Sequence, residues 1–154
     1  LTQDDRLLLQ LSAILHNTGN YINLNDVCEN SYNIVMSTEL IGISHRQRMI
    51  VASVVRYLHG QFPQYEQLQE PFSAEEYLKI AKLNAILRLA DAMDRSHKQK
   101  FKTVTTSLRG GQLTITGHTL YEITLEQGIF DLHASFFAEL FGIQPILKQR
   151  RSLQ

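Results

Sequence analysis

The chain has 154 residues, of which 44% are hydrophobic, and its 15 Lys and Arg residues balance its 15 Asp and Glu residues. This composition predicts one ordinary globular domain, or one domain with a small appendage, and excludes a disordered tail. The zero net charge excludes a protein that depends on overall attraction to nucleic acid or to an anionic membrane. Any anion-binding site therefore has to be local.

The single cysteine, Cys28, excludes an internal disulfide framework and a zinc site built from cysteines. No apolar run approaches the roughly 20 residues that a membrane span requires, and no signal segment opens the chain. The first residue is Leu1 rather than methionine. We therefore expect a piece of a longer cytoplasmic protein.

Apolar residues recur at helical spacing through most of residues 1–100. The pattern predicts helices over 4–15, 26–36, 45–58 and 74–97, separated by turns and by a loop over 63–71. Ser44 is expected to cap the third helix. Ser73 and Glu76 are expected to form a capping box at the start of the fourth, because each side chain can reach the other's backbone N–H group.

From residue 101 onwards the pattern changes to alternation. Lys102 to Leu108 is rich in Thr and Val, 109–112 has the composition of a tight turn, and the alternation continues to Gly117. A helix over 129–140 and a short strand over 143–147 follow. The sequence thus predicts an α+β fold, with a mostly helical domain over 1–100 and a β-β-α-β appendage over 101–154.

His16 lies where the first helix is expected to end, followed by the turn residues Asn17 and Gly19. One interpretation is that the imidazole projects into a cleft as a ligand. The commoner structural interpretation is a half-buried histidine with Asn17 at the helix C-terminus.

Asp91 shares one stripe of the longest helix with Asn84 and Arg88, because the three residues are spaced three or four apart. One interpretation is a surface ion pair with Arg88 or Arg95. The other is that Asp91 faces His16 across a cleft and ligates a metal.

Basic residues are concentrated after that helix, and a solvated surface is their commonest meaning. The alternative is a local anion-binding face. The residues that we select for that face are Arg95, Lys98, Lys100, Lys102 and Arg109, with a further group at the tail formed by Lys148, Arg150 and Arg151.

Four segments in order resemble the C-terminal HD-like domain of the exopolyphosphatase/guanosine pentaphosphate phosphohydrolase (Ppx/GppA) family. They are AILHNTG at 13–19, NSYNI at 30–34 with LIG at 40–42, ASVVRY at 52–57 and LRLADAMDR at 87–95. The resemblance implies a parent protein with an actin-like phosphatase module in front of a helical domain. It also implies that the HD-like domain is truncated at its N-terminus here, which would leave an apolar face open to self-association.

The positions that correspond to the HD metal site are His16, Asn17, Asn30, Leu58 and Asp91, and most of them have lost their ligands. Asn17 stands where metal-binding relatives have Asp, and Leu58 stands where they have His. His59 is displaced by one position, about 100° around a helix. His16 and Asp91 are too few to hold a divalent ion, so we expect these positions to be vestigial, with no bound metal and no catalytic residue.

The resemblance therefore implies a non-catalytic accessory domain that assists polyphosphate binding, mediates homodimer contacts, or does both. Its partners would be the phosphatase module and polyphosphate or guanosine pentaphosphate, and any Mg²⁺ would belong to the parent enzyme. Nucleic acid and membrane are not expected partners. Two alternatives remain: a metal-dependent HD-type phosphohydrolase, and a regulatory module that binds a nucleotide or a protein. Stoichiometric metal in the purified chain would favour the first alternative.

Overall fold

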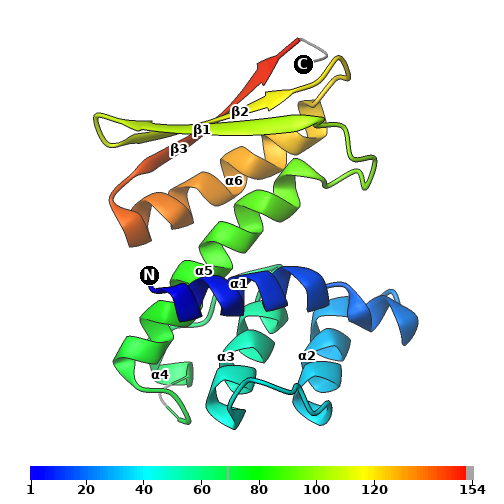
Figure 1. The fold of residues 1–154 in the computed structure, drawn as a ribbon, viewed down its shortest axis with the longest axis vertical. Helices are drawn as coiled ribbons and strands as arrows, with labels where there is room; N and C mark the ends of the chain where they lie inside the picture. Colours follow the sequence, from blue (N-terminus) through cyan, green and yellow to red (C-terminus); the bar gives the residue numbers. More distant parts are fainter. Residues whose placement is uncertain (69, 152–154) are drawn as a thin grey trace. The chain divides into compact units, whose positions relative to one another are not determined.

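A computed structural model describes residues 1–68 and 70–151. Its internal contacts divide the chain within one long helix, between Leu87 and Arg88, into an N-terminal unit and a C-terminal unit. Each unit has its own secondary structure (Figure 1). We describe the two units separately.

The N-terminal unit is helical. It contains α1 (Gln3–Leu15), the 3₁₀ helix η1 (Thr18–Tyr21), α2 (Val27–Ser37), α3 (His45–Arg56), α4 (Tyr65–Leu68) and most of α5 (Ala74–Met93). Reciprocal side-chain capping opens α1 at Thr2, α3 at Ser44 and α5 at Ser73. The expected helices are confirmed, although α3 ends at Arg56 and the one-turn helix α4 lies in the expected loop.

Helix α3 lies at the centre of this unit, packed against α1 and α2. Six consecutive residues, 50–55, are buried, and all of them except Ser53 are apolar, as expected for a helix enclosed by its neighbours. Asn84 of α5 is fully buried, and its side-chain amide donates to the carbonyl of Val54 over 2.8 Å. This bond fixes α5 against α3 within the unit.

The C-terminal unit contains β1 (Thr103–Arg109), β2 (Gln112–His118), α6 (Thr124–Phe141) and β3 (Gln144–Arg150), after the last turns of α5. The sheet order is β1-β2-β3, with β1 antiparallel and β3 parallel to β2. Helix α6 is the crossover that a parallel pair requires. It packs on one face of the sheet and leaves the other face open (Figure 1).

The predicted β-β-α-β arrangement and the α+β class are confirmed. Gly110 and Gly111 both have positive φ, which the tight turn between β1 and β2 requires. Helix α5 ends at Met93 instead of His97, because 94–100 form a loop in which the carboxylate of Asp94 accepts a hydrogen bond from the N–H of Gln99. Among the described residues, no helix has both the length and the hydropathy that crossing a membrane requires.

Candidate functional site

The turn after α1 is fixed by hydrogen bonds to α2. His16 is half-buried, and its Nδ1 lies 2.7 Å from the carbonyl oxygen of Ala13, one turn earlier. The Ser31 hydroxyl donates to the carbonyl of His16 over 2.9 Å and accepts from the N–H of Gly19 over 2.8 Å. Asn17 precedes η1 at its N-terminus. In this turn the backbone of 16–19, rather than the imidazole, makes the contacts with Ser31.

The other positions expected to be vestigial make different contacts. Leu58 is an aliphatic side chain that is only 2% exposed, and the Asn30 amide nitrogen donates to the carbonyl of Asn23 over 3.4 Å. Asp91 belongs to the C-terminal unit, where its carboxylate forms an ion pair with Arg95 at 3.3 Å. Within residues 1–68 and 70–151, no three His, Cys, Asp or Glu side chains are grouped closely enough to hold a metal ion. The donor set does not fit an HD-type metal centre.

Two of the five residues selected as anion-binding form ion pairs in the C-terminal unit. Arg95 binds Asp91, and the Lys100 ammonium lies 2.9 Å from a carboxylate oxygen of Glu126, whose side chain is fully buried. Lys100 also donates to the carbonyl of Glu122 over 2.8 Å. Its charge therefore serves to hold the 94–100 loop against α6.

The remaining three, Lys98, Lys102 and Arg109, are exposed. Arg109 is at the end of β1, and the strand register places it on the face of the sheet away from α6. We call this face the outer face. Along each strand, positions on the outer face alternate with positions that face α6, and on β3 the latter include the buried residues Pro145 and Leu147.

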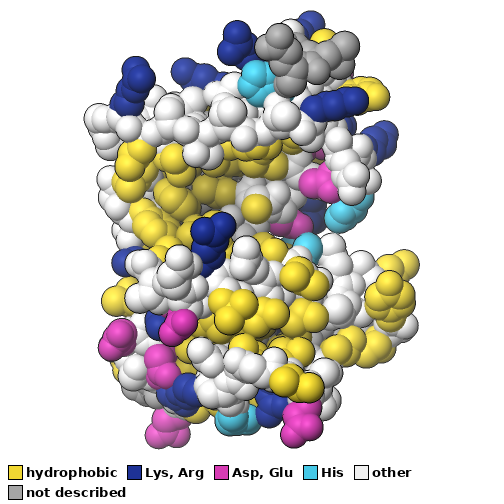
Figure 2. Space-filling model, viewed as in Figure 1, with side chains coloured by type: hydrophobic (Ala, Val, Ile, Leu, Met, Phe, Trp, Pro, Cys, Tyr) yellow, Lys and Arg dark blue, Asp and Glu magenta, His cyan; other side chains and the backbone are white. Residues whose placement is uncertain are grey.

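The outer face carries positive charge without any carboxylate on the three described strands. His118 pairs with Arg150 and Thr116 pairs with Lys148, so the two cations of β3 are adjacent to polar side chains of β2. In Figure 2, Lys and Arg side chains project from this side of the sheet. The twelve positions of the outer face are Thr103, Thr105, Ser107, Arg109, Gln112, Thr114, Thr116, His118, Gln144, Ile146, Lys148 and Arg150.

The neutral total charge conceals an uneven distribution along the chain. Residues 1–87 contain six Lys and Arg against nine Asp and Glu, a net charge of −3, whereas 88–154 contain nine against six, a net charge of +3. The sequence showed Lys148 and Arg150 only as part of a basic group at the tail, apart from the five selected residues. Their two-residue spacing is the signal that puts both on one face of a strand.

Comparison with known protein families gives one match. The family described as Ppx/GppA phosphatase, domain III, matches residues 1–140. The chain belongs to the Ppx/GppA phosphatase family. No match is found among curated proteins. The expected Ppx/GppA resemblance is confirmed, while the HD-like character of this domain stays a prediction. As domain III of a Ppx/GppA phosphatase, the chain implies a multidomain parent with a phosphatase module on its N-terminal side.

Proposed function

We propose that this Ppx/GppA domain III is a non-catalytic accessory domain and that the outer face of its C-terminal sheet binds polyphosphate. The observation that carries the proposal is the combination of Arg109, Lys148 and Arg150 on one face that has no carboxylate on the described strands. Membership of a phosphatase family supports a phosphate compound as the anion.

The spacing of these cations suits a linear polyanion. Lys148 and Arg150 lie two residues apart on one strand, which separates their Cα atoms by about 6.6 Å. Both are exposed, so they pay little desolvation cost before a phosphate arrives. Threonine and serine hydroxyls on β1 and β2 provide additional donors to phosphate oxygens between the charges.

The same face argues against single-stranded nucleic acid as the ligand. Proteins that bind single strands stack the bases on aromatic side chains. None of the twelve positions of the outer face is Phe, Tyr or Trp. A ligand that consists of phosphates alone makes full use of this face, whereas a nucleic acid would leave its bases without a partner.

A titration with three ligands tests the proposal against a nucleotide-binding regulatory role. Long-chain polyphosphate, guanosine tetraphosphate and inorganic phosphate are titrated into the chain by calorimetry at low and high salt. We expect polyphosphate to bind, and to weaken steeply with salt because binding releases counterions. Binding of the guanine nucleotide without polyphosphate binding would support the regulatory alternative and overturn the proposal.

A second candidate role is self-association, and the observation that favours it is the open edge of β1. This edge strand has β2 on one side and no other strand in the described part of the chain on the other. All seven residues of β1 are exposed, including Val104 and Leu108 at 47% and 59%. Its sequence, TVTTSLR, lacks the Lys and Pro residues that commonly protect such edges.

The charge pattern of β1 fits a second copy of the same strand. An antiparallel pairing centred on Thr106 puts Val104 opposite Leu108 of the other copy and Arg109 opposite Thr103, so no two like charges oppose each other. A peptide with acidic or bulky residues at these positions would fit less well. We therefore propose that this edge is where the homodimer forms.

Charge substitution at the centre of the strand tests this pairing. Thr106→Lys and Thr106→Glu should each give monomers in sedimentation equilibrium, because two like charges then meet at the symmetry axis. An equimolar mixture of the two variants should restore the dimer. Dimers that persist in both variants would place the interface elsewhere, for example at the exposed apolar side chains Ile14 and Leu24 of the N-terminal unit, and would contradict the proposal.

A further inference from the structure

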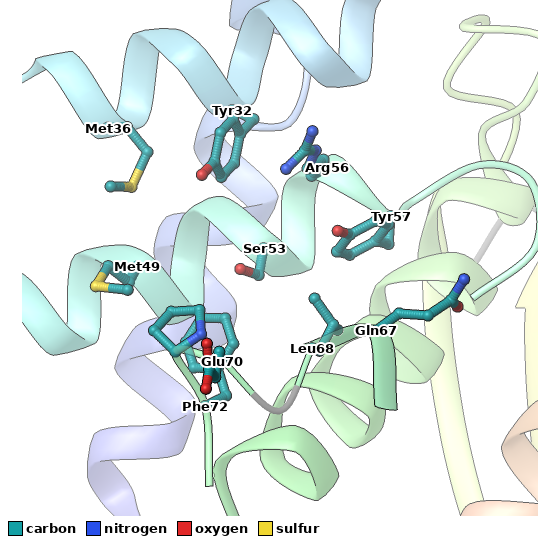
Figure 3. A pocket seen from close by; sticks show the side chains of 11 residues that line it. Tyr32, Met36, Met49, Ser53, Arg56, Tyr57, Gln67, Leu68, Glu70 and Phe72 are labelled. Carbon is teal, nitrogen blue, oxygen red and sulfur yellow. The ribbon is translucent and has the colours of Figure 1, made fainter. Parts of the chain in front are cut away.

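The N-terminal unit contains a pocket with a volume of about 180 Å³, lined by residues of α2, of α3 and by residues 67, 68 and 70–72. Figure 3 shows the side chains that line it. Its lining combines two methionines, Met36 and Met49, with the aromatic rings of Tyr32, Tyr57 and Phe72. Thioether and aromatic groups are the usual walls of a site for a small organic molecule.

Two arginines hold two of the pocket's aromatic walls in place. The Arg56 guanidinium binds both carboxylate oxygens of Glu29, at 2.8 and 3.0 Å, and lies 4.5 Å from the centre of the Tyr32 ring. On the other side, Arg46 lies 5.3 Å from the centre of the Phe72 ring. Walls that are already fixed lose little conformational entropy when a ligand binds.

Ser53 supplies a buried polar group to this pocket. The residue is 5% exposed and lies on α3, where it lines the pocket. In Figure 3, Ser53 lies in the middle of the lining, between Tyr32, Tyr57 and Leu68. Its hydroxyl is a polar group within a mainly apolar lining, where it can bind a ligand atom.

The environment of the pocket favours a neutral ligand. An ionised ligand would have to leave water for a lining of thioether and aromatic groups, which costs free energy unless its charge is paired there. The guanidinium of Arg56 is already paired with Glu29, and Glu70 is exposed to solvent. A neutral group avoids the desolvation cost and satisfies the apolar walls.

We propose that this pocket binds a small neutral aromatic or heteroaromatic ring whose polar edge hydrogen-bonds to the Ser53 hydroxyl. The volume agrees with a single ring, since a cavity of about 150 Å³ accommodates benzene. This site lies in the N-terminal unit and is independent of the outer face, which belongs to the C-terminal unit. The two proposals therefore fail or succeed separately.

Four ligands of similar size test the proposal by NMR titration of the ¹⁵N-labelled 154-residue chain. Phenol is neutral with a polar edge, toluene is neutral without one, benzoate is anionic and benzylammonium is cationic. We expect saturable shifts of amide resonances in α2 and α3 with phenol, weaker binding of toluene, and no saturable shifts with the two ions. Equal binding of all four ligands, or none by phenol, would overturn the proposal.

Two variants of Ser53 separate hydrogen bonding from space. Ser53→Ala should weaken phenol binding about fivefold, the effect of one hydrogen bond, and leave toluene binding unchanged. Ser53→Leu should fill the pocket and abolish binding of both, while Ser37→Leu on the exposed end of α2 serves as the matched control. If Ser53→Leu keeps a wild-type melting temperature and still binds phenol, the ligand lies elsewhere and the assignment is wrong.

Discussion

Lys100 and Glu126 form an ion pair in the C-terminal unit, with 2.9 Å between the ammonium nitrogen and Oε2. The second carboxylate oxygen of Glu126 accepts a hydrogen bond from the Ser96 hydroxyl. Burial by itself raises the pKa of Glu126, but the bonds from Ser96 and Lys100 outweigh it and lower the pKa. The 94–100 loop is thereby fastened to the first turn of α6.

Removing this carboxylate should destabilise the chain. Glu126→Ala leaves the Lys100 ammonium without its charged partner at a site where the lysine side chain is only 15% exposed. We expect a loss of about 3 kcal/mol in the free energy of unfolding, as is typical when one partner of a buried pair is removed. Urea denaturation measures it. Glu139→Ala, on an exposed position of the same helix, is the control and should change the free energy little; equal losses for the two variants would count against this role.

The stability of the chain should fall in acid. The hydrogen bonds from Arg46 lower the pKa of Glu76 from 4.5 to about 2, although burial opposes them. A carboxyl group whose pKa is lower in the folded state contributes stability that is fully present above pH 4.5 and is lost as the pH falls towards 2. Glu76→Gln removes this contribution. The free energy of unfolding, measured at pH 3 and pH 7, should therefore depend less on pH in the variant; an unchanged dependence would show that this pair does not contribute.

Gly19 and Gly128 should respond oppositely to the same substitution. A Cβ atom at Gly19 would lie 2.2 Å from the carbonyl oxygen of Val27, so η1 and α2 would have to separate. We expect Gly19→Ala to cost about 2–4 kcal/mol. At Gly128, inside α6, a Cβ atom would meet no atom within 4 Å, so Gly128→Ala should stabilise by about 0.5–1 kcal/mol. Thermal unfolding of the two variants measures both effects, and a tolerated Gly19→Ala would contradict the packing described here.

The features of the fold that were predicted correctly, such as helix starts and tight turns, depend on residues close together in the sequence. The Ser73–Glu76 capping box involves residues three apart, and its interactions depend on no distant element. The same holds for the turn at Gly110 and Gly111. The end of α5 at Met93 was not predictable in this way, since the loop after it depends on Glu126, which is 26 residues beyond Lys100 in the sequence.

The candidate site was predictable only in part, for a similar reason. The concentration of positive charge near the end of the chain is visible in the sequence, but pairing decides which charges are available. Nothing in the sequence distinguishes Lys100 from Lys102, and the difference becomes visible only when the structure shows Lys100 paired with Glu126. Likewise, Lys148 and Arg150 join Arg109 on one face through the parallel register of β3 with β2, which the α6 crossover sets over a long separation.

The measurement that tests the polyphosphate proposal most directly is the salt dependence of polyphosphate binding by the double variant Lys148→Gln/Arg150→Gln. We predict that this variant binds about tenfold more weakly than the parent chain and that the slope of log affinity against log salt becomes shallower by about 1.5 units, because two phosphate contacts are lost. The control, Arg6→Gln/Lys82→Gln, removes the same residue types from the N-terminal unit and should leave both quantities unchanged. Identical affinity and slope in the parent chain and in the Lys148→Gln/Arg150→Gln variant would contradict the proposal.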